Sequence, residues 1–145
     1  ETSWLIDRGT EVLGDPAYRE KLLPITGEIA ENIYNTAYKN HSLMNECERG
    51  VDDTTRVWWV QAEAVVGFLN AWQKKPEETK YLDAAKDIWG YIKEYVIDKR
   101  EGSEWFWCVN ADGSPIHKPI VEPWKCPYHN GRMCMEVIRR LSTQQ

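Results

Sequence analysis

The sequence lacks a long apolar run, a basic stripe and a paired-cysteine motif, and it contains only three histidines and two phenylalanines. A bilayer span needs about 18 or more consecutive apolar residues, and no such stretch is present. The opening residues, ETSWLIDRG, have neither the basic start nor the small-residue cleavage pattern of a signal peptide. We therefore expect a cytoplasmic protein that does not contact membranes.

Basic residues are not concentrated in any one part of the sequence. The 18 basic and 23 acidic residues leave a net charge of −5, and lysine and arginine are scattered along the chain. A nucleic-acid-binding protein usually gathers its basic residues on one face. This pattern excludes a nucleic-acid partner and favours a small or uncharged one.

The four cysteines form no C-x-x-C pair and no regular disulfide framework, so we expect free, buried thiols. Cys126, His129 and Cys134 lie near one another in the sequence. Structural zinc usually takes four ligands arranged as two close pairs, and this trio does not supply them. We expect no metal site.

Tryptophan is the abundant residue, with eight against two phenylalanines. Its indole has a large apolar face and an N–H that needs a partner, so the surplus indicates a cleft as well as a core. Trp4, Trp72 and Trp89 lie in helical apolar stripes and are expected in the core. The others lie at predicted hairpins or helix starts: Trp58, Trp59, Trp105, Trp107 and Trp124.

Apolar spacing predicts a mainly helical chain with short hairpins. Gly14 is expected to end the first helix, Asp15-Pro16 to start the second, and Asp112-Gly113 to form a hairpin turn. Pro24 is expected near a break or kink. The predicted helices cover 2–13, 16 to about 38, 59–73, 78–98 and about 129–141, with a strand over 42–50 and a β-hairpin over 103–118.

The order helix, helix, hairpin recurs at a regular interval along the chain. The step from Gly50 to Gly113 is the same as the step from Tyr18 to Tyr81. A fixed period of this kind is typical of an architecture built from repeated helical hairpins. We expect the hairpins to close into a ring in which every second helix lies on the inside.

A polar residue lies at the equivalent point of each inner helix: Glu1, then Glu63, then His129, at nearly the same interval. In a ring of hairpins these points converge at one mouth. Trp58 lies five positions before Glu63, as Trp124 lies five before His129. Helix capping or a buried ion pair is the structural alternative for these polar residues.

His129 is the candidate catalyst, because an imidazole takes and returns a proton near neutral pH. His41 and His117 lie in loop or hairpin contexts without comparable neighbours and are not assigned a role. Indole faces stack on the C–H patches of sugar rings. Inverting a carbon beside a carbonyl needs two bases, one on each face, and the repeat supplies no second histidine beside His129.

Three segments resemble the cellobiose 2-epimerases of the N-acylglucosamine 2-epimerase superfamily. They are RVWWVQAEAVVGFLNAW (56–72), EWFWCVNADGSP (104–115) and EPWKCPYHNGRMCMEVIRRL (122–141). The opening ETSWLIDRGTEVLGD resembles the segment that follows Gly-His in that family's G-H-x-x-E-(A/T)-S-W-L motif. The resemblance implies an all-α fold, an (α/α)6 barrel of helical hairpins with short β-hairpins at the active-site end. Residues 1–145 would be a single-domain fragment, the C-terminal part of that barrel.

The resemblance also implies roles for single residues. His129 would be one of two acid/base histidines that move the C2 proton of the reducing-end sugar through ring opening and a cis-enediolate. The other histidine would lie three positions before Glu1, which would orient it, tune its charge or hold a substrate hydroxyl. Glu63, in WWVQAE, is similar to an active-site carboxylate of the family. Trp59 and Trp124, and less clearly Trp58, would stack on the sugar rings.

The activity implied is epimerisation of the reducing-end glucose of cellobiose and related β-1,4-linked disaccharides to mannose. The resemblance implies no cofactor or metal. The expected partners are the disaccharide or oligosaccharide and the N-terminal part of the same barrel, in a monomer. N-acylglucosamine epimerases proper have a Phe-His-Val-Pro-like run in place of PYHNGR, and this departure argues against an N-acetyl sugar.

Three alternatives remain at the level of sequence. An aldose–ketose isomerase on the same barrel would reprotonate the enediolate at C1. A glycoside hydrolase would use Glu1 and Glu63 as paired carboxylates, but it leaves His129 without a task. A non-catalytic helical repeat would show no convergence of tryptophan, histidine and glutamate at one mouth.

We predict that the chain of 145 residues alone is inactive and unfolds easily, because an open part-ring leaves apolar hairpin faces bare. The measurement is cellobiose epimerisation and thermal unfolding of the isolated piece beside a longer protein that contains the whole barrel. Measurable epimerisation by the isolated piece would refute the prediction.

Overall fold

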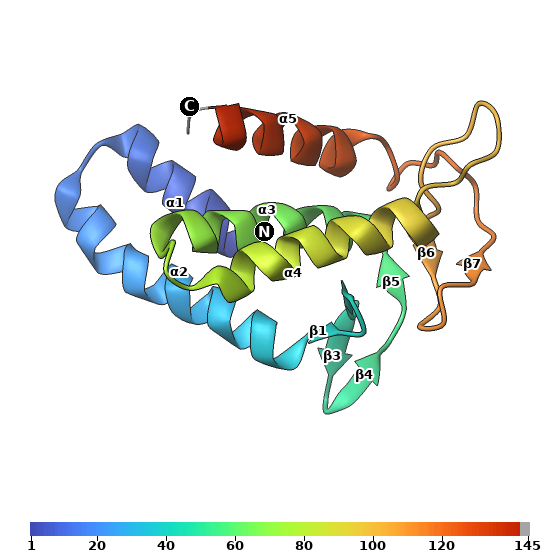
Figure 1. Ribbon diagram of the computed structural model, residues 1–145, viewed down its shortest axis with the longest axis horizontal. Coiled ribbons are helices and arrows are strands. Elements are labelled where there is room, and N and C mark those ends of the chain that lie inside the picture. The colour runs from blue at the N-terminus through green and yellow to red at the C-terminus, as the bar shows by residue number, and fades with distance from the viewer. Residues whose placement is uncertain (143–145) are drawn as a thin grey trace.

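A computed structural model describes residues 1–142 and shows two helical hairpins followed by a fifth helix (Figure 1). Short connections join the two helices of each hairpin, which pack against each other. A π-helical turn, η1 (Ile92–Val96), continues the fourth helix. The helices are α1 (Thr2–Leu13), α2 (Pro16–Thr36), α3 (Trp58–Lys74), α4 (Thr79–Tyr91) and α5 (Tyr128–Ser142).

Within residues 1–142 the strands form three small antiparallel sheets, which lie at one end of the helices, on the right in Figure 1. In the third sheet Val57, just before α3, pairs with Cys108. The β-hairpin around Gly113 is therefore joined directly to the start of α3. The pairs are β1 (Tyr38–Lys39) with β2 (Ser42–Leu43), β3 (Glu46–Glu48) with β4 (Val51–Asp53), and β5 (Arg56–Val57) with β6 (Cys108–Val109) and β7 (Pro115–Ile116).

Local sequence signals account for the ends of the first helices. Gly14 takes the left-handed conformation, with φ of 69°, that ends α1. The Asp15 side chain then accepts a hydrogen bond of 2.9 Å from the Ala17 backbone N–H and caps α2. Gly113, with φ of 85°, makes the turn between β6 and β7, where a side chain would collide with the Tyr95 ring. These three predictions are confirmed.

Other predicted boundaries were wrong. Pro24 lies inside a continuous α2, so the helix has no break there, and the Thr26 hydroxyl bonds to Asp7 of α1 close by. The helix predicted over 78–98 ends at Tyr91 and passes into the π-helical turn. The strand predicted over 42–50 is two separate strands, each paired with a different neighbour.

Helix α3 forms the centre of the core. Nearly every residue from Trp58 to Ala71 is buried, and the helix contacts α1, α2, α4 and α5. A helix that is apolar on all sides needs cover on all sides, which explains this position. Within residues 1–142, no helix is both long and apolar enough to cross a membrane.

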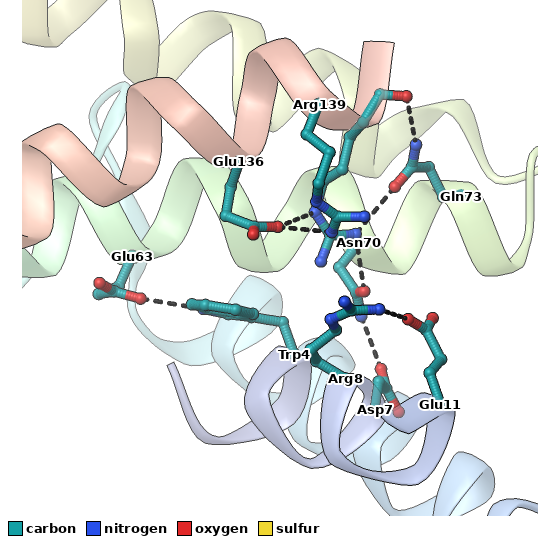
Figure 2. Close-up of polar contacts among 10 residues, drawn as sticks. Trp4, Asp7, Arg8, Glu11, Glu63, Asn70, Gln73, Glu136 and Arg139 are labelled. Atoms are coloured by element: carbon teal, nitrogen blue, oxygen red, sulfur yellow. Dashed lines mark hydrogen bonds and ion pairs between the residues drawn. The ribbon is translucent and has the colours of Figure 1, made fainter. Parts of the chain in front are cut away.

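A buried polar network links α1, α2 and α3. The carboxylate of Asp7, which is 4% exposed, accepts hydrogen bonds of 2.6 Å from the Thr26 hydroxyl and the Asn70 amide, and it pairs with Lys74. Figure 2 shows Asp7 and Asn70 facing each other across the two helices. From α5, Arg140 donates to the Asn70 oxygen at 3.0 Å. The network therefore cross-links α5 as well.

An apolar groove of about 540 Å³ runs between α4 and α5 over α3. Trp72, Trp89 and Val137 are among its lining residues, and Ile138 at its edge is 66% exposed. Exposed apolar surface of this kind usually takes a neighbouring element.

We predict that Asp7→Ala lowers the free energy of unfolding by about 3 kcal/mol, because it leaves Lys74, Asn70 and Thr26 without their shared acceptor. The measurement is urea unfolding. The control, Glu11→Ala on the same helix, removes a half-exposed carboxylate paired with Arg8 and should cost no more than about 0.5 kcal/mol. Equal losses in the two variants would contradict the prediction.

Candidate active site

Glu1, Glu63 and His129 lie together, at the starts of α1 and α5 and in the second turn of α3. One side-chain oxygen or nitrogen from each lies within 4.8 Å of the others. They are far apart in the sequence, at nearly equal intervals, so the repeated hairpins bring them to the same place. The structure thus groups the three polar residues that the repeat predicted to share one mouth.

Glu63 is the buried centre of this group, with a side chain only 4% exposed. One oxygen, Oε2, accepts from the Trp4 indole N–H at 2.9 Å, as Figure 2 shows. The other, Oε1, lies 2.8 Å from His129 Nδ1 and accepts from Arg132 at 2.6 Å. Burial raises the pKa of Glu63, but hydrogen bonds from Arg132, His129 and Trp4 outweigh it and hold the pKa below its usual value. Glu63 is therefore a carboxylate at neutral pH.

The ionised Glu63 decides how the His129 ring is protonated. A carboxylate only accepts hydrogen bonds, so His129 Nδ1 must carry the hydrogen that the two groups share. In the neutral ring, Nε2 then has a free lone pair and is the basic atom. The ring lies against Trp59, with centroids 5.5 Å apart, and its side chain is 23% exposed. This is the arrangement of a general base held by a carboxylate.

Arg132, one turn after His129 on α5, completes the group. Its Nη2 contacts both Glu63 and Glu1, and its Nη1 donates to the Tyr128 hydroxyl at 2.6 Å. The guanidinium lies 5.0 Å from the centre of the Trp4 ring. Sequence reasoning missed Arg132, although its place three positions after His129 predicts the same helix face.

Trp4 was expected only in the core, and it is buried, at 3% exposed. Its N–H nevertheless holds Glu63, and the guanidinium groups of Arg132 and Arg140 lie 5.0 and 6.0 Å from its ring centre. The signal was available, because a buried indole N–H needs an acceptor. Trp4 thus lies between the group at Glu63 and the polar network around Asp7 and Asn70.

A buried lysine holds the loop that precedes α5. Lys125 is fully buried, ion-pairs with Glu104 and donates to the Ile120 carbonyl at 2.8 Å. Glu104 also accepts from the side chain of Asn130, the residue after His129. A buried lysine must be paired, so this contact fixes the loop before α5 against the preceding segment. His129 is positioned from both sides by this pair and by Glu63.

A cavity of about 400 Å³ adjoins the group. Glu1, Glu63 and Trp59 lie on its wall, together with Asn45, just before β3, and Asp52 of β4. The remaining wall is mainly apolar and comes from α2 and α3. A concave, largely apolar cavity with a few polar groups is typical of a small-molecule site.

The three candidate tryptophans have different surroundings. Trp59 is half-buried, on the cavity wall and against His129. Trp58 is 3% exposed, packs against Trp107 in the core and is not among the residues on the cavity wall, so its contact with a substrate stays a prediction. Trp124 is 85% exposed in the loop before α5, with its faces open to solvent.

Glu1, Glu63 and His129 are also close enough to serve as metal ligands. The guanidinium of Arg132 already contacts both carboxylates, however, and a cation in that position opposes a second one. The group therefore fits a proton-transfer site better than a metal centre. The cysteines are free thiols as expected, but only Cys108 is buried; Cys47, Cys126 and Cys134 are exposed, and none is part of the group.

The two remaining histidines lie elsewhere. His41 Nδ1 is 3.0 Å from the Asp87 carboxylate at the surface, and His117 is exposed just after β7. Neither belongs to the group formed by Glu1, Glu63 and His129.

Helical hairpins that bring two carboxylates and a histidine together beside a cavity define a helical-hairpin protein with a candidate small-molecule site. The N-acylglucosamine 2-epimerase (GlcNAc 2-epimerase) family matches residues 4–131. The chain belongs to that family.

Curated relatives are similar along nearly the whole chain. The cellobiose 2-epimerase of Ruminococcus albus is 52% identical over 141 residues, which make up 97% of this chain and 36% of that protein. The cellobiose 2-epimerase of Eubacterium cellulosolvens is 48% identical over 139 residues, 96% of this chain and 34% of that one. The chain therefore spans about a third of the length of these relatives.

Solved structures agree on the fold. A sugar epimerase from a ruminal bacterium superposes with a TM-score of 0.92 at 52% identity, over 95% of this chain and 36% of that one. Cellobiose 2-epimerase from Bacillus thermoamylovorans gives 0.86 at 50% identity, over 95% and 35%. A D-mannose isomerase, at 17% identity and a TM-score of 0.72 over 94% and 34%, shares the fold. The predicted fold class, part of an (α/α)6 barrel, is confirmed.

We predict that Glu63→Gln weakens the acid dependence of stability. The folded-state pKa of Glu63 lies below its usual value, so its stabilisation is present above about pH 4.3 and is lost as the pH falls through the folded pKa. The melting temperature of the unmodified protein should therefore fall more steeply between pH 5 and 3 than that of the variant. Glu11→Gln, an exposed control, should keep the steeper fall; a variant curve parallel to the unmodified one would refute the prediction.

Proposed function

We propose that the chain is part of a carbohydrate 2-epimerase that converts the reducing-end glucose of cellobiose and related β-1,4-linked disaccharides to mannose. The observation that carries the proposal is the 2.8 Å contact between Glu63 and His129 Nδ1 beside a cavity with a tryptophan on its wall. The names of relatives that are 48 and 52% identical support the substrate class.

His129 is the proposed acid/base residue. After the sugar ring opens, the hydrogen on C2 is acidic because C1 is an aldehyde carbon. Neutral His129 takes that proton on Nε2, the C–H electron pair forms the C1–C2 double bond, and the carbonyl oxygen becomes the enediolate oxygen. Glu63 stabilises the resulting imidazolium and keeps the ring in place through Nδ1.

A second base on the other face of C2 completes the inversion. We propose a histidine three positions before Glu1, outside the printed sequence, which returns a proton to C2 while His129 keeps the one it took. Glu1 then orients that histidine or tunes its charge. In the reverse direction the two bases exchange tasks, so the equilibrium between the two sugars is reached from either side.

Trp59 and Trp124 are the proposed stacking surfaces for the sugar rings. Trp59 lies against His129, close enough to hold the ring that reacts. Trp124 is five positions from His129 and exposed, so it is available to a more distant ring of the substrate. Asn45 and Asp52 on the cavity wall supply polar groups for hydroxyls. The remaining part of the barrel supplies the rest of the site in a monomer, without a cofactor.

The test is the reaction of the full-length protein with cellobiose in heavy water. We expect deuterium at C2 and a mannose reducing end. His129→Asn should lower the rate by about 10²- to 10⁴-fold, the usual contribution of a general base. His117→Asn, in the exposed hairpin, should leave the rate unchanged.

Other products would replace the proposal with one of its alternatives. A ketose as the main product would mean an aldose–ketose isomerase, and free glucose would mean a glycoside hydrolase. Full activity of the His129 variant would remove the proposed base.

A further inference from the structure

One guanidinium connects the two carboxylates of the site. Arg132 Nη2 contacts Glu1 and, at 2.6 Å, Glu63. It also lies 3.5 Å from His129 Nδ1, and its side chain is only 17% exposed. In the proposed function each of these carboxylates serves a different histidine. Arg132 is therefore placed to act on both proton-transfer pairs at once.

The groups that face Arg132 come from three helices. Helix α1 supplies Glu1 and the Trp4 ring, α3 supplies Glu63, and α5 supplies Tyr128 and His129. Arg140 approaches Trp4 as well, with its guanidinium 6.0 Å from the ring centre. The amino group of residue 1 is also near, and burial lowers its pKa, which favours its neutral form. In a longer chain this nitrogen is an uncharged amide.

The charged side chains in direct contact at the site have a net charge of minus one. Glu1 and Glu63 contribute two negative charges and Arg132 one positive charge, which leaves one negative charge. A single imidazolium brings that total to zero, while two would make it positive. Charges this close and partly buried interact strongly, so the neutral total is favoured.

We propose that Arg132 is a positioning residue that sets the number of protons held by the two acid/base histidines at one. This inference rests on the proposed function. Moving the C2 proton from one face to the other needs one histidine neutral, as the base, and one protonated, as the acid. Without Arg132 the two carboxylates favour two imidazolium ions, and no base is left.

The first test is the pH–rate profile of kcat for cellobiose epimerisation by the full-length protein and its Arg132→Gln variant. Loss of the positive charge favours imidazolium. The acid limb of the profile, where kcat falls with pH because the base becomes protonated, should therefore move up by about one pH unit, within the range that a neighbouring charge causes. At a pH on that limb, kcat should fall about tenfold as a result. Arg132→Lys keeps the charge and should keep the position of the limb.

The second test makes the net charge of the site more positive, the opposite of Arg132→Gln. Glu1→Gln removes a negative charge, so both limbs should move down. The double variant with Arg132→Gln again carries one negative charge, from Glu63, and its limbs should return toward those of the unmodified protein even if kcat stays low. A role in packing alone would give neither opposite shifts nor this compensation.

The matched control is Arg139→Gln, on the same helix, where Arg139 pairs with Glu136 away from the site; its limbs should not move. Limbs that stay in place in Arg132→Gln and Glu1→Gln would overturn the inference while epimerisation by the unmodified protein still supports the proposed function. If Arg132→Gln fails to fold, Glu1→Gln decides by the same criterion. No deuterium at C2 with the unmodified protein would overturn the proposed function and this inference with it.

Discussion

The buried carboxylate of Glu63 is the interaction on which the rest of the site depends. Its two oxygens receive hydrogen bonds from Trp4 of α1 and from His129 and Arg132 of α5, while Glu63 itself belongs to α3. Isolated burial of a carboxylate is costly, and three donors from two other helices offset that cost. The three helices can therefore pack in only one register if this charge is to be satisfied.

Further along α3, at Asn70, the same three helices are joined a second time. Trp4 lies between the two levels, since it donates to Glu63 and its ring faces the guanidinium of Arg140. Arg140 in turn contacts Asn70, which donates to Asp7. Two polar cross-links, separated by an indole, thus keep α1, α3 and α5 at fixed distances. The His129 ring is thereby held in position without any contact from a ligand.

Sequence reasoning found the helices, the hairpin turn at Gly113 and the shared location of Glu1, Glu63 and His129, because these follow from local rules and a regular repeat. It placed the end of α4 too late, because the chain passes into a π-helical turn after Tyr91, and α2 continues through Pro24 without a break. It also missed Arg132: the spacing from His129 predicts a shared helix face, but the partners of Arg132 on other helices, Glu1 and Glu63, follow only from the packing.

The adjacent residues Trp58 and Trp59 show what the sequence can predict and what requires the tertiary structure. The sequence by itself determined that an indole would lie at the start of α3, near a glutamate one turn later and a histidine one repeat after that. Only the tertiary structure decided that Trp58 packs in the core and Trp59 lies on the cavity wall. The physical reason is that neighbouring residues point to different sides of a helix, and packing against other helices decides which side is the core.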